Sequence, residues 1–192
     1  MQHLLDIITS TDNDLPNINP TQIYNEGWMT RLLMKQSILE KTNLKEFDFG
    51  KFNNWTSEAL ISSPFLNAKE CNEGYTHADI AFGDCTVDYI KSGKLEIEKE
   101  SKIFGIIEAK MKSGLSKGTK NHPNAYNQSS RTVTCISENT HNKQNCDIYF
   151  IVVAPRKKLM NIAHKFEKHF LIDQIKKRFG KSEKSNNKWN IL

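Results

Sequence analysis

The sequence predicts an α/β domain with a mixed β-sheet flanked by helices, and three observations support this class. Residues 102–111 and 146–155 are apolar runs typical of strands, and a helical pattern over 124–139 lies between them. Residues 74–84 alternate like a strand, and residues 86–101 read as two short strands joined by a turn. A strand–helix–strand connection joins parallel strands through a right-handed crossover, so part of the sheet must be parallel.

The N-terminal part of the chain predicts a helix followed by a segment of mixed character. Asn19–Pro20 is a typical helix start, because Asn caps a helix well and Pro fits its first turn. The helix continues over residues 21–39, where apolar side chains recur every three or four positions. Residues 41–74 are Asn-rich and allow a short helix around Ser57–Ile61.

The C-terminal part adds the central strand and the last helix. We expect residues 146–155 to form a central strand covered on both faces, because the apolar run is continuous. Residues 157–179 predict one basic amphipathic helix that ends at Gly180. Its inward positions would be Leu159, Ile162, Phe166 and Phe170, and its outward ones Lys157, Lys165, Lys168 and Lys176. We predict a single domain over 1–180 and a flexible basic tail over 181–192.

The bulk properties indicate a globular protein outside the membrane and the secretory route. No run approaches the ~18 apolar residues of a membrane span, and the first residues lack the basic region of a secretory signal. The four cysteines form no C-x-x-C pair, which disfavours a zinc site. We therefore expect a cytoplasmic protein with reduced thiols and no membrane partner.

The net charge of +5 is unevenly distributed along the chain. Residues 1–100 hold 9 Lys/Arg and 16 Asp/Glu, a net charge of −7. Residues 101–155 hold 7 Lys/Arg and 3 Asp/Glu, a net charge of +4. Residues 156–192 hold 11 Lys/Arg and 3 Asp/Glu, a net charge of +8. The positive part would attract a polyanion such as nucleic acid; a solvated basic helix and tail would account for the same charges.

Charged residues interrupt the apolar strand 102–111. Because side chains alternate across a strand, Glu108 and Lys110 share one face. Buried there without partners they would be costly, and an ion pair at the strand end is the ordinary explanation. Asp79 lies on a strand upstream, and two carboxylates on neighbouring strands can hold a hard cation such as Mg²⁺.

Two helical patterns add candidates. Glu26 begins a half-apolar stripe with Met29, Leu33 and Gln36, which hints at a buried site, although an exposed helix Glu is commoner. On the helix 124–139, Gln128, Arg131 and Cys135 form a stripe that would face the site or a phosphate, or else routine polar surface.

The ordered set Glu26, Asp79, Glu108-Ala109-Lys110 and Gln128 resembles the PD-(D/E)XK nuclease superfamily. The resemblance covers about residues 20–155, and the predicted αβββαβ order is similar to the restriction-endonuclease-like core of that family. It implies that Asp79 and Glu108 bind the metal, Mg²⁺ with Mn²⁺ as a substitute. Lys110 would position or activate the attacking water and stabilise the developing charge.

The resemblance also implies roles for the two helical residues. Glu26 would match an acid that binds a second ion or a water on the metal, and Gln128 a glutamine near the metal site. Ala78 stands where many members have proline before the aspartate.

The sequence thus predicts a Mg²⁺-dependent nuclease, with DNA as the expected substrate. Its basic loop offers Lys112, Lys117 and Lys120, together with Arg131, as nucleic-acid contacts. Two alternatives stay open: a nuclease-like fold that binds nucleic acid without cleaving it, and an interaction subunit of a larger assembly docked by its basic tail. A homodimer is equally open.

Overall fold

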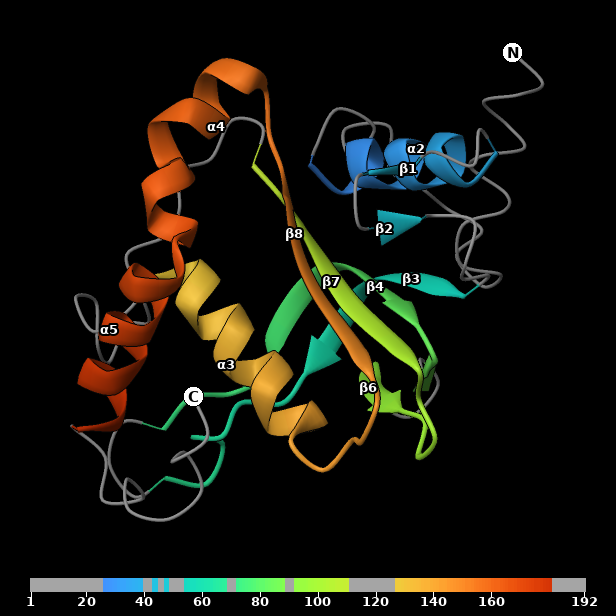
Figure 1. The fold of residues 1–192 in the computed structure, drawn as a ribbon. Helices are drawn as coiled ribbons and strands as arrows, with labels where there is room; N and C mark the ends of the chain where they lie inside the picture. The colour runs from blue at the N-terminus through green and yellow to red at the C-terminus, as the bar shows by residue number, and fades with distance from the viewer. Residues whose placement is uncertain are drawn as a thin grey trace. The chain divides into compact units, whose positions relative to one another are not determined.

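The computed structural model describes residues 26–39, 43–44, 47–48, 54–68, 72–88, 92–110 and 127–180 (Figure 1). In chain order its elements are α2 (Glu26–Leu39), β1 (Asn43–Leu44), β2 (Phe47–Asp48), β3 (Trp55–Ile61), β4 (Thr76–Gly83), β5 (Cys85–Asp88), β6 (Lys94–Ile97), β7 (Ile103–Ala109), α3 (Gln128–Thr140), β8 (Asp147–Val153), α4 (Arg156–Ile162), η3 (Ala163–Phe166) and α5 (Lys168–Phe179).

The chain divides into two compact units that it enters and leaves several times. The first unit comprises Met1–Ala59, His77–Ala109 and Lys143–Val152. The second comprises Leu60–Thr76, Lys110–Asn142 and Val153–Leu192. The predicted domain boundary at residue 180 stays a prediction, because residues 181–192 lie outside the described part of the chain.

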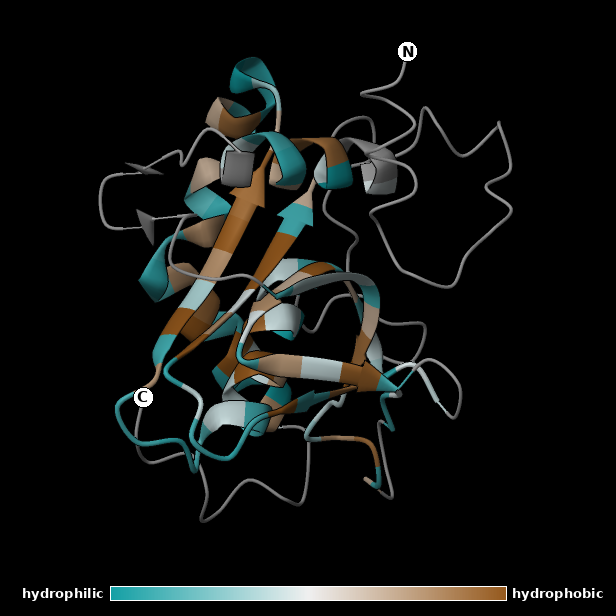
Figure 2. Ribbon diagram, turned by 90° about the vertical axis from the view of Figure 1, so that its right-hand side faces the viewer, coloured by the Kyte–Doolittle hydropathy of each residue, from teal (hydrophilic) through white to brown (hydrophobic). Residues whose placement is uncertain are grey.

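Six strands form one mixed sheet in the order β5-β6-β3-β4-β7-β8, and β1 and β2 pair separately. The pairs β4–β7 and β5–β6 are antiparallel. β7 and β8 run parallel, because Asp147 N–H donates to Lys102 O at one end and Lys110 N–H donates to Val153 O at the other, both at 2.8 Å. The chain is therefore an α/β protein, and the parallel pair is the one joined through α3, as predicted. The strands carry mostly hydrophobic residues (brown in Figure 2).

Several predicted elements are confirmed and three are corrected. The helix expected over 21–39 is present as α2, that over 124–139 as α3, and the hairpin over 86–101 as β5 and β6. The short helix allowed around Ser57–Ile61 is wrong, since β3 occupies these residues. In the sheet, β5 and β6 lie beyond β3, which leaves β4 free to pair with β7.

The prediction that residues 146–155 form a central strand is also wrong. β8 is an edge strand of the sheet, and none of its side chains is fully buried. An apolar run alone does not distinguish an edge strand from a central one, because both are rich in β-branched and aromatic residues. The strand covered on both faces is β7, in which every residue after Ile103 is buried.

The last helix is broken rather than continuous. α4 is followed by the 3₁₀ turn η3, and Glu167 adopts an extended conformation (φ −65°, ψ 139°) before α5 begins. The expected inward positions Leu159, Ile162, Phe166 and Phe170 are at most half-buried. The buried residues are instead Ile175, Arg178 and Phe179. Ile175 and Phe179 pack with Phe65 and Ala68 in a hydrophobic cluster of the second unit.

The β4–β7 pair depends on a close approach at Gly105. This glycine lies opposite Phe82, and a Cβ added to it would stand 2.1 Å from the Phe82 ring. The ring therefore lies over the glycine and reaches toward Tyr149 of β8, with 6.4 Å between ring centroids. At the turn after β4, Gly83 has a φ of +103°, which L side chains rarely adopt.

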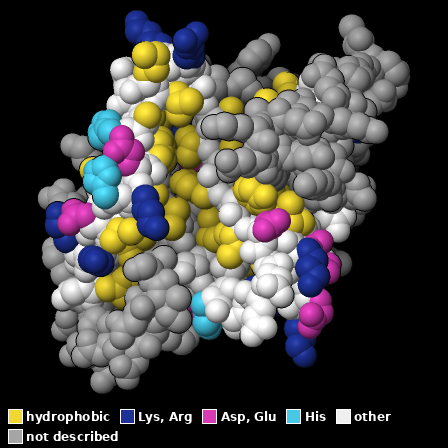
Figure 3. All heavy atoms as spheres, viewed as in Figure 1, with side chains coloured by type: hydrophobic (Ala, Val, Ile, Leu, Met, Phe, Trp, Pro, Cys, Tyr) yellow, Lys and Arg dark blue, Asp and Glu magenta, His cyan; other side chains and the backbone are white. Residues whose placement is uncertain are grey.

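Large hydrophobic side chains are exposed on both units. Among the described residues they are Tyr75, Ile148, Leu159 and Met160, and Met160 is 72% exposed. Figure 3 shows hydrophobic side chains (yellow) at the surface over α4 and over β8. No helix within the described ranges is long and apolar enough to cross a membrane.

We predict that Gly105→Ala destabilises the protein by about 1–3 kcal/mol, the usual effect of overpacking a tight core. The added methyl group would displace the Phe82 ring, because the ring atoms lie too close to the position of the new Cβ. Urea unfolding measures the change. Gly74→Ala is the matched control, because nothing lies within 4 Å of that position. Equal stabilities of the two variants would contradict this account of the packing.

Candidate active site

The candidate site lies where β4 and β7 part. Their backbone pairing runs from Gly83↔Phe104 to Ile80↔Ile107, although β4 begins four residues earlier, at Thr76. The same register continued by one residue would set Asp79 opposite Glu108. Directly opposite residues of an antiparallel pair share a face, with Cβ atoms about 5 Å apart. The joint placement of the two carboxylates stays a prediction, and the printed contact is the one that Asp79 makes beside Glu108, with the backbone of Ala109.

Asp79 ends the ladder with its side chain. Its Oδ2 atom accepts a hydrogen bond of 2.7 Å from the Ala109 N–H, so a carboxylate takes the place of a strand carbonyl. The side chain is half-buried. This bond fixes the orientation of the Asp79 carboxylate beside the residue that follows Glu108.

Asp84 plays the same structural part at the opposite end of the pair. Its Oδ2 atom accepts hydrogen bonds from the N–H groups of Lys102 (2.7 Å) and Ile103 (3.2 Å). Both ends of the β4–β7 pair are therefore closed by an aspartate. The two ends differ in chemistry, because Asp84 lies beside Ile103 at one end, whereas Asp79 lies beside Ala109, next to Glu108, at the other.

Glu108 is fully buried on an apolar face of β7. It shares that face with Phe104 and Ile106, which are also 0% exposed, and Ala81 lies opposite Ile106. Burying a carboxylate is costly unless hydrogen bonds, a cation or a metal compensate it. A glutamate at this position therefore does not help an apolar strand to fold, and its presence calls for another explanation.

Lys110 begins the second unit, one peptide beyond β7. It is 4% exposed, and its N–H donates to Val153 O. The chain itself keeps Lys110 two residues from Glu108, as the predicted E-x-K pattern requires.

The helix α2 lies against β7 and begins at Glu26. The side chain of Glu26 is outside the described part of the structure, so its role as a metal ligand stays a prediction. The predicted stripe is wrong in its far end, because Gln36 is exposed. Among the side chains of α2 that the structure describes, the buried ones are Thr30, Met34 and Ser37, a stripe rotated by about one residue from the expected one.

Gln128 is the first residue of α3, in the second unit, and is half-buried. The helix is capped by Asn127, whose side chain accepts the Ser130 N–H at 2.9 Å. Asn127 N–H in turn donates to Gln174 of α5 at 2.6 Å. These bonds fix the start of α3, and the assignment of Gln128 to the site stays a prediction.

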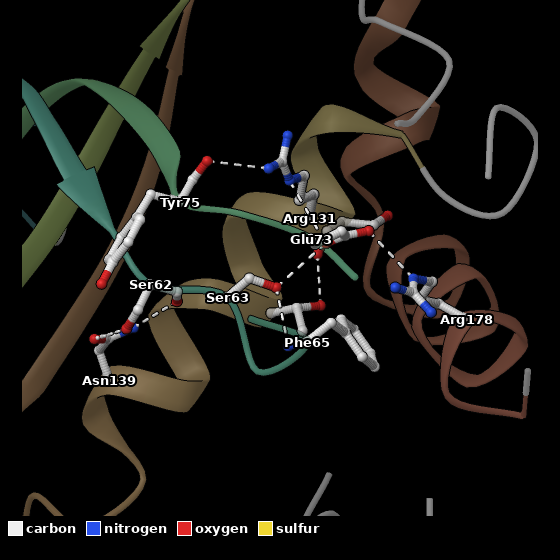
Figure 4. Close-up of polar contacts among 10 residues, drawn as sticks. Ser62, Ser63, Phe65, Glu73, Tyr75, Arg131, Asn139 and Arg178 are labelled. Atoms are coloured by element: carbon white, nitrogen blue, oxygen red, sulfur yellow. Dashed lines mark hydrogen bonds and ion pairs between the residues drawn. The ribbon is translucent and has the colours of Figure 1, made fainter. Parts of the chain in front are cut away.

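Arg131 makes internal contacts in the second unit (Figure 4). Its Nη2 donates to Tyr75 O at 3.2 Å, and its Nε lies 3.6 Å from Glu73 Oε2. Its side chain is 23% exposed. A nucleic-acid contact was predicted for Arg131, and any such contact would have to compete with these bonds.

Arg131 and Glu73 belong to a polar cluster that also contains Arg178, a partner of Glu73 that was not predicted from the sequence. Arg178 Nε donates to Glu73 Oε1 at 3.2 Å, and both side chains are fully buried. The guanidinium also lies 3.7 Å above the Phe65 ring, and Ser63 Oγ donates to Glu73 Oε2 at 3.3 Å. The two charged residues are 105 positions apart, and no spacing rule links residues at that separation.

The lysines of the predicted basic loop lie outside the described residues, and the two buried cysteines are unsuited to nucleophilic catalysis. Lys112, Lys117 and Lys120 fall outside the described residues. Burial raises the pKa of the Cys85 thiol to about 12, helped by nearby Asp84, and raises that of Cys135 to about 12 as well. Neither thiol is a nucleophile near neutral pH.

Comparisons with protein-family models, with curated proteins and with solved structures return no match.

We predict that Arg178→Met lowers the free energy of unfolding by about 3–5 kcal/mol, because it leaves the buried Glu73 without its closest cation. Denaturant unfolding measures the loss. Lys177→Met is the matched control: its neighbouring ion pair with Asp173 is surface-exposed, and such pairs contribute about 0–1 kcal/mol. Similar losses in both variants would show that the buried pair does not hold α5 in place.

Proposed function

We propose that the chain is a divalent-metal-dependent nuclease that hydrolyses phosphodiester bonds, with DNA as its substrate. The observation that carries the proposal is the hydrogen bond of the Asp79 carboxylate to Ala109 N–H, next to the buried Glu108, at the end of the β4–β7 pairing. The E-x-K pattern and its resemblance to the PD-(D/E)XK superfamily support the same assignment.

The two carboxylates suit a hard cation. Mg²⁺ is commonly held by one or two carboxylates, with water and substrate phosphate completing its shell. Among the described residues no group of three or more His, Cys, Asp or Glu side chains is arranged to hold a metal. The proposed site therefore relies on Asp79 and Glu108, with Glu26 as a further ligand. A bound Mg²⁺ would supply charge neutralisation on the scissile phosphate.

The other roles fall to residues of the chain. The bond from Ala109 N–H keeps the Asp79 carboxylate in one orientation, so this ligand needs no rearrangement. The Lys110 ammonium is assigned to positioning the attacking water and to offsetting the negative charge that develops on the phosphate. Its burial strengthens that interaction, because charges interact more strongly away from bulk water.

One observation favours a second candidate, a nuclease-like fold that binds nucleic acid without cleaving it. Glu108 is 0% exposed and Lys110 is 4% exposed, whereas a reacting phosphate must reach its catalytic groups. In that case the two residues would be compensated charges of the interior.

Incubation of the purified chain with supercoiled plasmid and with single-stranded DNA decides between the two candidates. The proposal expects cleavage in Mg²⁺ or Mn²⁺ and none in EDTA. DNA binding with no cleavage in any metal would support the second candidate instead.

We predict that Asp79→Asn and Glu108→Gln each lower cleavage by on the order of a thousandfold, since metal catalysis contributes several kcal/mol. Both changes keep the side-chain volume, and asparagine still accepts the Ala109 N–H. Calorimetry should show that Mg²⁺ affinity is lost. Asp84→Asn removes a carboxylate from the other end of the same strands and should leave metal binding and cleavage intact. Parental metal affinity in either site variant would remove that residue from the site.

Lys110→Met should retain Mg²⁺ and DNA binding and lose turnover, because the charge is assigned to the transition state rather than to the bound ground state. Methionine keeps most of the volume at this buried position. Single-turnover cleavage at saturating protein separates turnover from affinity. A rate close to that of the parent would refute the assignment.

A further inference from the structure

α4 is a short helix that presents its side chains to solvent. None of the residues of Arg156–Ile162 is buried. Met160 is 72% exposed, the largest value among the exposed hydrophobic side chains of the described residues. A large apolar side chain that is this exposed contributes little to the packing of the core.

Two cations share the face of Met160. Arg156 and Lys157 are both exposed, and they precede Met160 by four and three residues. Residues at these spacings are neighbours on a helix surface. Figure 3 shows Lys and Arg side chains (dark blue) next to exposed hydrophobic ones (yellow) at the part of the surface formed by α4. The face thus combines one apolar tip with two positive charges.

The surroundings in the same unit are also positive. Residues 156–179 contain eight Lys/Arg and two Asp/Glu. Asp173 is bound to Lys177 at 2.6 Å, and Glu167 lies 3.5 Å from His169. The face of α4 therefore has an electrostatic preference for a polyanion.

α4 also begins close to Lys110. The Val153 carbonyl accepts the Lys110 N–H, and Arg156 follows three residues later. Three residues span at most about 11 Å. A nucleic acid that reaches Lys110 would therefore come within range of the first turn of α4.

We infer that α4 docks on the DNA duplex, with Arg156 and Lys157 on backbone phosphates and Met160 inserted as an apolar wedge at a base step. This inference rests on the proposed function and names how its substrate is held. Proteins that bind the minor groove frequently insert apolar side chains, methionine among them, between base steps. An interfacial membrane helix needs a broad apolar face, whereas the exposed large apolar side chains of α4 are Met160 and Leu159, with Ile162 half-buried.

The wedge is tested by binding in EDTA to a duplex that carries 2-aminopurine, whose fluorescence rises when a base step opens. The parent should raise the fluorescence. Met160→Ala should bind within a few-fold of the parent without the rise, and Met160→Leu should restore it. Ile148→Ala, which shortens an exposed side chain of β8, is the control and should behave as the parent. A full rise with Met160→Ala would overturn the wedge.

The two phosphate contacts are tested by the salt dependence of the same binding. Arg156→Gln/Lys157→Gln should flatten the slope of log affinity against log salt by about 1.8, or about sevenfold in affinity for a roughly threefold rise in salt. The control Lys99→Gln/Lys102→Gln removes two exposed charges elsewhere and should keep the parental slope. Equal slopes for the two double variants would overturn the contact.

Two further outcomes separate this inference from its basis. Binding to phosphatidylserine vesicles that depends on Met160, without binding to the duplex, would assign α4 to a membrane surface and overturn the inference. The chain could also show the expected fluorescence rise and salt dependence but never cleave DNA. That outcome would overturn the proposed nuclease activity and still support the docking of α4 on the duplex.

Discussion

The hydrogen bond from Ala109 N–H to the Asp79 carboxylate is the contact on which the candidate site depends. It closes the β4–β7 ladder with a side chain, and so it fixes both where the strands part and which way Asp79 faces. The packing of Phe82 over Gly105, three residues from Glu108, holds the same two strands in register. A shift of one residue would move Glu108 to the other face of the sheet and separate the carboxylates. Register and chemistry are therefore specified by the same few residues.

The parts of this arrangement that follow from local periodicity could be predicted from the sequence. Alternation along β7 correctly set Glu108 on the face of Phe104 and Ile106, and the strand–helix–strand order correctly predicted the parallel β7–β8 pair. What the sequence could not reveal was the order of strands. The apolar content of β8 is that of a central strand, yet pairing places it at the edge. The break at Glu167 is similarly hidden, because no proline or glycine marks it and the helical pattern continues through it.

The polar cluster around Glu73 in the second unit shows a different limit of prediction from the sequence. Arg131 and Arg178 both lie beside Glu73, and the pairing of Glu73 with Arg178 joins segments that are far apart in the chain. A count of basic residues treats both arginines as available to a polyanion, although Arg178 is fully buried. Exposed cations of α4 and α5 such as Arg156, Lys157 and Lys176 differ from Arg178 in this respect. The charge asymmetry of the sequence does not distinguish the exposed cations from the buried one.

The exposure of the carboxylate pair is unequal, and this inequality constrains the proposed chemistry. Glu108 is fully buried, whereas Asp79 is half-buried. In the proposed site Asp79 would be the carboxylate that solvent can reach, whereas Phe104 and Ile106 occupy the rest of the Glu108 face. A buried carboxylate ligand would also favour a tightly held ion, because the cation offsets the cost of burying the charge.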